Sequence, residues 1–241
     1  MYHKSSWSFS KEVSQQFDNH VRQSVPFYDL IQSSIASLSD YFVSPHGLIY
    51  DLGCATGETI ALLERRHAQK KLRFIGIDNS KAMLEKAILK NRNNHRAVFH
   101  RRDLEQLSFD EKSRFILSVL TLQFVPFQER KKIIHNIYEN LYEGGAFVMV
   151  EKTLSAAPTF QDIFTHAQYD MKLEQGLSHE EVLLKQQSIR SVMMPISVQD
   201  NLQILREAGF QVEIFLKHWQ FTGFIAVKPY VEISHACQLY L

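Results

Sequence analysis

The chain has 241 residues, a length that suits one large α/β domain with added elements. Its 27 basic and 26 acidic residues leave a net charge of +1, which removes the global electrostatic case for binding nucleic acid or an anionic membrane directly. Its two cysteines, Cys54 and Cys237, are too few for a disulfide framework or a zinc site. No apolar run approaches the roughly 20 residues that span a bilayer, and residues 1–10 lack an apolar signal core. These features predict a cytoplasmic enzyme.

Two amphipathic helices are predicted for residues 11–43, because apolar residues recur at helical spacing through this segment. Pro26 interrupts the pattern and separates the two helices. Residues 48–151 then alternate between strand and helix patterns, which is typical of a parallel sheet with helices on both faces. The predicted strands are 48–52, 72–77, 97–100, 115–120 and 146–150. The predicted helices between them are 56–68, 79–91 and 127–141, the last ended by Gly144 and Gly145.

A helical insertion at 155–195 breaks this alternation, with a second helix expected from 178 to 193. A further helix from 197 is ended by Gly209, and strands 211–216 and 221–227 follow as an antiparallel hairpin. We therefore predict one α/β domain over 1–241, with a core at 48–151 and a closing helix and hairpin at 197–228. The N-terminal helices and the insertion are predicted to form a lid. Residues 229–241 have no assigned role.

The segment from Leu48 to Glu58 carries the clearest functional signal. An apolar run ends in Asp51 and is followed by Gly53 and Gly57, which predicts a strand, a tight turn and a helix. The N–H groups at the start of that helix suit a polar or anionic ligand group. A second acid, Asp78, ends the next strand, where it can accept hydrogen bonds from ribose hydroxyls. The combination predicts a nucleoside cofactor.

The spacing of this turn is D-x-G-x-x-x-G rather than the G-x-G-x-x-G of dinucleotide sites. It resembles the first motif of class I S-adenosylmethionine-dependent methyltransferases, which implies a Rossmann-like, mostly parallel sheet with an antiparallel last strand. The plain alternative is a strand-to-helix connection of any α/β protein. The residues expected to contact the cofactor from their positions at strand ends and turns are Asp51, Gly53, Cys54, Ala55, Gly57, Asp78, Asn79, Asp103, Ser118 and Val119.

Methyl transfer needs little catalytic machinery, because the sulfonium is already a reactive electrophile and placement of the acceptor supplies much of the rate. A general base helps only when the acceptor has a proton to lose. No catalytic residue is assigned, and for each candidate an ordinary core or surface role is the stronger interpretation. The 11 histidines show no metal-binding spacing, so no metal is expected. The candidates for a base are His20, Tyr28, Glu151, His166 and Tyr169.

A closer resemblance, over about residues 10–228, is to the carboxy-S-adenosylmethionine synthases. It rests on QSVPFY at 23–28, YDLGC at 50–54, IDNS at 77–80, TLQF at 121–124, AGF at 208–210 and the ending 219–228. Those enzymes use S-adenosylmethionine and prephenate to make carboxy-S-adenosylmethionine, which serves later in modification of a tRNA wobble uridine. The resemblance implies cofactor contacts at Tyr28, Asp78, Asn79, Asp103, Leu104 and the 53–55 turn.

Two positions depart from that family. Val119 stands where the family has an asparagine, and Gln186 stands where it has an arginine for the extra carboxylate. A glutamine cannot make the charged two-pronged contact of an arginine. Arg190, one helical turn later, is a candidate substitute. These departures favour binding of ordinary S-adenosylmethionine.

The main functional hypothesis is therefore a methyltransferase that uses S-adenosylmethionine, releases S-adenosylhomocysteine and acts on a small molecule. The alternative is a carboxy-S-adenosylmethionine synthase, and a second alternative is a non-catalytic cofactor-binding protein. An exposed apolar insertion helix makes a homodimer an expectation to test. The predicted substrate pocket contains Phe17, Phe160, Phe164, Gln186 and Arg190.

Overall fold

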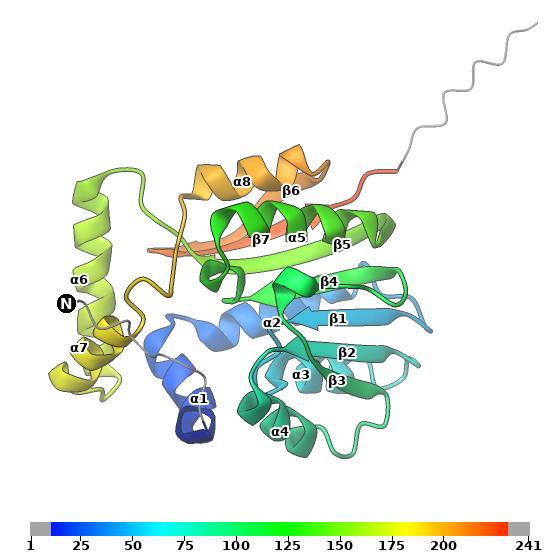
Figure 1. The fold of residues 1–241 in the computed structure, drawn as a ribbon, viewed down its shortest axis with the longest axis horizontal. Coiled ribbons are helices and arrows are strands. Elements are labelled where there is room, and N and C mark those ends of the chain that lie inside the picture. The colour runs from blue at the N-terminus through cyan, green and yellow to red at the C-terminus, as the bar shows by residue number, and fades with distance from the viewer. Residues whose placement is uncertain (1–10, 231–241) are drawn as a thin grey trace, which may run out of the picture.

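The computed structural model describes residues 11–230, which form a seven-stranded sheet with helices on both faces (Figure 1). The strand order is β3-β2-β1-β4-β5-β7-β6, and all neighbours are parallel except for β7, which is antiparallel to both β5 and β6. The predicted Rossmann-like sheet with an antiparallel last strand is confirmed. The strands are β1 (Leu48–Leu52), β2 (Arg73–Asp78), β3 (Ala97–Arg101), β4 (Ser113–Val119), β5 (Leu141–Lys152), β6 (Gln211–His218) and β7 (Phe221–Val227).

The helices divide between the two faces according to which side of the sheet they bury. Helices α5 and α8 share one core cluster with η1, and helices α2 and α3 share the cluster on the opposite face. The elements are α1 (Lys11–Ser24), α2 (Tyr28–Ser39), α3 (Glu58–Arg66), α4 (Lys81–Lys90), η1 (Leu104–Gln106), η2 (Leu122–Phe124), α5 (Phe127–Glu139), α6 (Pro158–Glu174), α7 (His179–Ser188) and α8 (Val198–Glu207).

Strand β1 shows how the sequence builds both cores at once. All five of its residues are buried. Leu48, Tyr50 and Leu52 pack into the cluster with α5 and α8, whereas Ile49 packs into the cluster with α2 and α3. Alternate side chains of a strand point to opposite faces, so a central parallel strand has to be apolar almost throughout. The polar exception, Asp51, therefore needs a functional or structural reason.

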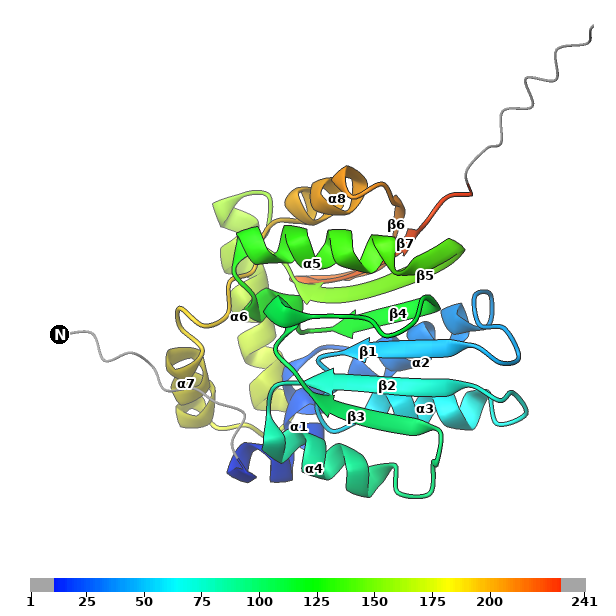
Figure 2. The same ribbon diagram turned by 45° about the vertical axis from the view of Figure 1, so that its right-hand side comes forward.

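The insertion between β5 and α8 lies beyond the carboxyl ends of the parallel strands. Helices α6 and α7 stand there beside α1 (Figures 1 and 2). Two side-chain bonds join α1 to α6, from Gln168 Nε2 to Ser24 O at 3.1 Å and from Gln23 Nε2 to Gln175 O at 3.0 Å. The two segments predicted to form a lid are thus neighbours in space.

Some predicted boundaries were wrong. Helix α5 ends at Glu139, and Gly144 and Gly145 lie within β5 rather than stopping the helix. Gly144 has a φ of +69°, and a Cβ on Gly145 would stand 2.8 Å from the carbonyl oxygen of Tyr142. Helix α7 ends at Ser188, short of the predicted 193, and the chain then turns through a left-handed Ser191. Within residues 11–230, no helix is long and apolar enough to cross a membrane.

Candidate active site

A cavity of about 390 Å³ lies at the carboxyl ends of β1, β2, β4 and β5, the position where open α/β sheets bind ligands. Residues of α1, α6 and α7 line it from the other side. Its wall therefore combines a glycine turn and two acids at one end with side chains from the helical insertion at the other.

The glycine turn after β1 is shaped by close packing against the end of β4. Gly53 has a φ of +77°, and a Cβ at this position would lie 2.1 Å from Thr121 Oγ1. Ala55 also has a positive φ, of 45°. The Gly53 and Cys54 N–H groups both bond to the carbonyl of Ile77, at 2.7 and 3.0 Å. Only a residue without a side chain fits at 53, so the bare backbone faces the cavity.

Asp78 at the end of β2 holds this turn in place. Its Oδ2 accepts the Ala55 N–H at 3.0 Å, and its Oδ1 accepts the Ser80 N–H at 2.8 Å. Burial raises the pKa of Asp78, and these backbone bonds act in the opposite direction by favouring the carboxylate. The cavity lining also includes Asp78. The acid predicted to meet a ribose thus also orders the turn that would face the same ligand.

Asp51 is almost fully buried at the end of β1 and lines the same cavity. Its Oδ2 has no hydrogen-bond partner within the described structure. Burial, with a contribution from the charge of Asp78, raises the pKa of Asp51 to about 8. A positively charged ligand group beside Asp51 would stabilise its carboxylate, because an opposite charge favours the ionised form.

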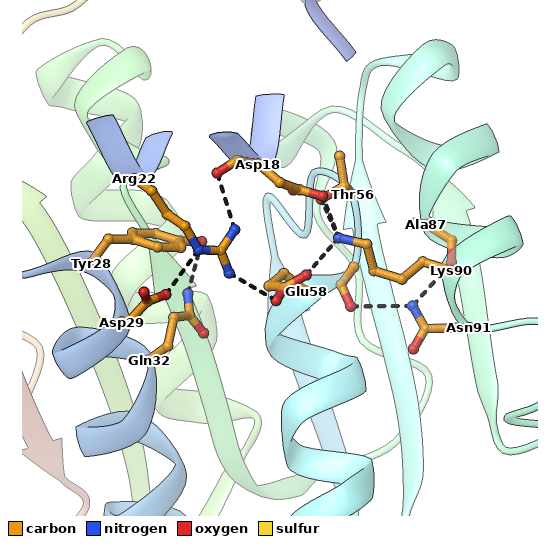
Figure 3. A network of polar contacts seen from close by, with 11 residues as sticks. Asp18, Arg22, Tyr28, Asp29, Gln32, Thr56, Glu58, Ala87, Lys90 and Asn91 are labelled. Atoms are coloured by element: carbon orange, nitrogen blue, oxygen red, sulfur yellow. Dashed lines mark hydrogen bonds and ion pairs between the residues drawn. The ribbon is translucent and has the colours of Figure 1, made fainter. Parts of the chain in front are cut away.

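A charged network joins α1 to the helices that follow the glycine turn (Figure 3). Lys90 Nζ donates to Asp18 Oδ2 and to Glu58 Oε2, both at 2.6 Å, and Arg22 Nη2 donates to Glu58 Oε1 at 3.1 Å. Thr56 Oγ1 donates to Asp18 Oδ1 at 2.5 Å. The network therefore fixes the N-terminal helix over the cofactor side of the cavity.

Tyr28 and His20 face the cavity from this N-terminal segment. Tyr28 Oη accepts a bond from Gln32 Nε2 at 2.9 Å, and the Arg22 guanidinium lies 5.6 Å from the centre of its ring. Burial raises the pKa of Tyr28, with the charge of Glu58 adding to the effect, so the phenol stays neutral. Burial lowers the pKa of His20, helped by the charges of Lys185 and Lys172. Both groups are thus neutral hydrogen-bonding groups near pH 7.

Glu151 lies behind the cavity wall rather than in it. Its Oε1 accepts the N–H groups of Thr121 and Leu122, at 3.3 and 3.0 Å. Burial raises the pKa of Glu151 to about 8, although Arg130 and these N–H bonds favour its charged form. Glu151 is therefore placed to position the turn after β4.

The opposite end of the cavity carries three lysines that sequence reasoning did not single out. Lys152 ends β5, Lys172 lies on α6 and Lys185 lies on α7. Lys152 Nζ donates to Gln168 Oε1 at 3.0 Å. No local motif links these three positions, although Lys152 is the last residue of a central strand. A search for cations at strand ends could have found Lys152 but not the other two.

The other predicted site residues fall into two groups. Tyr28, Asp51, Gly53, Cys54, Ala55, Asp78, Asn79, Asp103, Leu104 and Val119 line the cavity, as do Phe17 and His20. Gly57 instead precedes α3 with a φ of 71°, and Ser118 is buried in β4. Asp103 Oδ1 also accepts the Glu105 N–H at the start of η1.

Several predicted substrate and catalytic residues stand elsewhere in the described structure. Phe160 and Phe164 stack on each other along α6 instead of lining the cavity, and His166 is exposed. Tyr169 Oη and His179 Nδ1 form a hydrogen bond of 2.6 Å. Gln186 and Arg190 line an adjoining hollow, which shares Lys152, Ile189 and Met193 with the cavity. Which side chains of α6 and α7 reach the cavity depends on how these helices pack, which periodicity alone could not reveal. Ile163, Leu183 and Leu184 are also exposed, and the homodimer stays a prediction.

Comparison with known proteins identifies the family. Residues 49–145 match the family described as Methyltransferase domain. The chain is 35% identical over 229 residues to a carboxy-S-adenosyl-L-methionine synthase of Staphylococcus epidermidis, covering 94% of this chain and 99% of that protein. The chain belongs to the carboxy-S-adenosyl-L-methionine synthase family.

A second member of the carboxy-S-adenosyl-L-methionine synthase family, from Methylococcus capsulatus, is 35% identical over 226 residues, covering 92% of this chain and 93% of its own. Among solved structures, an O-methyltransferase family protein from Burkholderia thailandensis superposes with a TM-score of 0.65 at 15% identity, covering 92% of this chain and 61% of that chain. The structural likeness confirms the predicted methyltransferase fold. The relatives cover the insertion as well as the core, so the family relation includes the segments that line both ends of the cavity.

Proposed function

We propose that this chain makes carboxy-S-adenosylmethionine from S-adenosylmethionine and prephenate. The observation that carries the proposal is the 35% identity to a carboxy-S-adenosyl-L-methionine synthase over 94% of this chain and 99% of the relative. A shared methyltransferase core would support only the coarser function. The shared insertion matters more, because α6 and α7 supply the cavity wall opposite the glycine turn.

The residues present suit S-adenosylmethionine. The side-chain-free backbone at Gly53 leaves room for a close ligand, and the turn is held by Asp78. The unpartnered Oδ2 of Asp51 suits an ammonium group of the ligand. Asp78 and Asp103 line the part of the cavity where ribose and adenine would bind. When bound, S-adenosylmethionine supplies a methyl carbon made reactive by the positive charge of the attached sulfur.

Helices α1, α6 and α7 are proposed to act as the lid of this site. Helices α1 and α6 are joined by the Gln168–Ser24 and Gln23–Gln175 bonds, and α1 is held to α3 and α4 by the Asp18 and Glu58 network. Closing these helices over the sheet would keep water from the reacting groups. Hydrogen exchange of α6 and α7 should slow when S-adenosylhomocysteine binds, and unchanged exchange would argue against a lid.

A second candidate function is methyl transfer to a small-molecule acceptor. Two observations favour it: Val119, a residue with no polar side-chain group, lines the cavity, and Gln186 supplies no positive charge. Ordinary S-adenosylmethionine has no carboxyl group on its methyl carbon, so its binding does not require the family's arginine. This candidate shares the fold, the cofactor and the glycine turn with the first. It differs in the fate of the methyl carbon, which would be transferred to an acceptor instead of staying on the sulfur and gaining a carboxyl group.

The deciding experiment incubates purified protein with S-adenosylmethionine labelled with ¹³C on the methyl carbon, with and without prephenate, and analyses nucleosides by mass spectrometry. Carboxy-S-adenosylmethionine that retains the label and requires prephenate supports the proposal. No carboxylated nucleoside, with bound and unchanged S-adenosylmethionine, contradicts it. Conversion of the cofactor to S-adenosylhomocysteine by a small-molecule acceptor would favour the second candidate. A Gly53→Ala variant serves as the control for conversion outside the cavity.

A further inference from the structure

Arg130 is a buried cation that lies behind the cavity wall. It stands close to the N-terminus of α5 and is only 3% exposed. Burial of a guanidinium is costly unless its donors are bonded, and the dipole at a helix N-terminus disfavours a positive charge. Burial lowers the pKa of Arg130, although the charge of Glu151 acts against that shift. An arginine stays protonated in a protein, so this buried charge needs a reason to be there.

The guanidinium of Arg130 bonds to backbone carbonyls of two segments that are far apart in the chain. Arg130 Nε donates to Val125 O at 2.7 Å, and Nη2 donates to Gln123 O at 3.3 Å. Nη2 also donates to the carbonyl of Met194, in the segment that leads from α7 back to α8 (Figure 1). The planar fork of an arginine can serve several acceptors at once. Arg130 thus joins the turn after β4 to the end of the insertion.

Both of the joined segments supply side chains to the cavity wall. Gln123 lines the cavity from η2, and Met193 lines it from the insertion. Met193 and Pro195 also line the adjoining hollow, so Met194 lies between two residues of these walls. The Met194 N–H donates to Gln123 O at 2.7 Å, which bonds the two segments directly as well. Arg130 is therefore placed to fix how the insertion meets the ends of the strands.

The other end of η2 is held by a different side chain. Glu151 Oε1 accepts the N–H groups of Thr121 and Leu122, at 3.3 and 3.0 Å. Thr121 in turn packs against Gly53 in the glycine turn. An acid suits the N–H groups at the start of a helical turn, and a cation suits the carbonyls at its end. Glu151 therefore serves the nucleoside end of the cavity, whereas Arg130 serves the insertion.

We propose that Arg130 is a positioning residue that fixes the insertion wall of the cavity for the second substrate. The inference deepens the proposed function, on which it rests for the identity of that substrate as prephenate. The glycine turn and Asp78 suit the nucleoside, which leaves the wall from α6, α7 and Met193 for prephenate. Without the fork of Arg130, this wall would be assembled in only a fraction of the molecules, and the apparent affinity would fall by that fraction. Saturating prephenate would restore the assembled wall, so the KM rises while kcat changes little.

The first test separates KM from kcat in the full chain, with carboxy-S-adenosylmethionine measured by mass spectrometry. Arg130→Lys keeps the charge but loses the fork, and Arg130→Met removes both. We expect the KM for prephenate to rise about ten-fold or more in both variants, with kcat within about three-fold and S-adenosylhomocysteine affinity within about two-fold of wild type. Arg96→Lys is the matched control, because Arg96 is half-buried and bonds to the carbonyl of Lys70. Equal losses of affinity for S-adenosylhomocysteine and prephenate would indicate a general packing defect and overturn the proposal.

Hydrogen exchange of single amides, followed by NMR, gives a readout that does not need turnover. The Met194 amide should exchange about ten-fold faster in Arg130→Lys, whereas the Ala55 amide, which is bonded to Asp78, should keep its wild-type rate. In the wild-type S-adenosylhomocysteine complex, prephenate should slow exchange at Met194, and this measurement decides the matter if the variants fail to fold. Equal exchange at Met194 in wild type and Arg130→Lys would overturn the proposal. Turnover of prephenate by a wild type whose Met194 amide it does not protect would overturn it too.

The outcomes for Arg130 and for the proposed function are distinguishable. A wild type that forms no carboxylated nucleoside, together with faster exchange at Met194 in Arg130→Lys, would reject the synthase activity and sustain the positioning of the insertion wall. Carboxylated product formed by Arg130→Lys with the wild-type KM would sustain the synthase activity and reject the positioning role.

Discussion

The two ends of the cavity are built in opposite ways. At the glycine-turn end, Asp78 accepts two backbone N–H groups and the turn is locked against Thr121, so the arrangement is specified by contacts within a short part of the core. At the lysine end, Lys152, Lys172 and Lys185 come from three elements and repel one another. The first end is held by hydrogen bonds within the protein, whereas the second gathers cationic side chains from three separate elements.

This contrast indicates which part of the site can accept substitutions without disturbing the fold. The glycine turn depends on backbone geometry that tolerates almost no substitution. The insertion can change its charged side chains without disturbing the sheet, because α6 and α7 lie beyond the strand ends (Figure 2). The departures at Val119 and Gln186 are therefore compatible with the retained nucleoside end.

The largest expected loss of cofactor affinity comes from substitution of Gly53. Gly53→Ala should lower S-adenosylhomocysteine affinity by about 100-fold or more, since the new Cβ adds left-handed strain and a clash. The clash is with Thr121 Oγ1, which would lie 2.1 Å from the added Cβ. Calorimetry is the measurement. Gly176→Ala is the matched control, because Gly176 also has a positive φ, of 89°, but nothing lies within 4 Å of the place that its Cβ would occupy. Comparable losses in the two variants would contradict the packing argument.

Asp78→Ala should weaken binding of S-adenosylhomocysteine by about ten-fold or more, because a ribose partner and the acceptor for Ala55 N–H are removed together. Asp162→Ala, which changes an exposed acid of α6, should leave affinity unchanged. Isothermal titration of both variants checks the difference. An unaltered affinity in Asp78→Ala would end the ribose assignment.

The lysine end should respond to pH, and the nucleoside end should respond much less. Carboxylate affinity should fall about ten-fold from pH 6.5 to pH 9, because Lys185 and Lys152 lose their protons near 7 and 8. Affinity falls as the pH rises because only the protonated, positively charged lysine attracts the carboxylate. The titratable groups near them include Lys172 on α6 and His20 on α1, which itself lies near Glu181 of α7. Affinity of the S-adenosylhomocysteine complex for prephenate, measured across this range, is the check. A flat profile would contradict the charge argument.

The network over the glycine turn should contribute less, because its ion pairs are partly exposed and screened by water. Lys90→Met removes bonds to Asp18 and Glu58 and should cost about 0.5–1 kcal/mol, a two- to five-fold loss of cofactor affinity that shrinks in high salt. Lys81→Met, which removes a highly exposed pair on the same helix, is the control. The affinity of both variants for S-adenosylhomocysteine is measured at low and at high salt. A loss of cofactor affinity in Lys81→Met as large as that in Lys90→Met would contradict a role of the network.

The smallest effect is expected at the position where the family arginine is missing. Gln186→Arg should change carboxy-S-adenosylmethionine affinity by less than about two-fold, since residue 186 lines the adjoining hollow with Arg190 rather than the cavity itself. A gain of ten-fold or more would show that this side chain reaches the ligand and would shift the carboxylate position toward α7.

Sequence reasoning was most successful where local rules decide structure. The strand at 48–52, the break at Pro26 and the hairpin strand at 221–227 have the predicted places. It was wrong at Gly144 and Gly145, which lie within β5: Gly144 has a positive φ and packs against the Tyr230 side chain, and Gly145 packs against the Tyr142 carbonyl. Phe160 and Phe164 fit a helical apolar stripe, but the stripe does not indicate which side of α6 faces the sheet.

The sequence by itself determined the order of strands and helices, the glycine turn and the acids at the strand ends, because each depends on residues that are close in the chain. It also carried the family resemblance. Only the tertiary structure decided which residues of the insertion reach the cavity. Lys172 and Lys185 are brought to Lys152 by the packing of α6 and α7 beyond the sheet, and such long-range convergence leaves no periodic or local signal. The charge of the second end of the cavity is therefore a property of the fold.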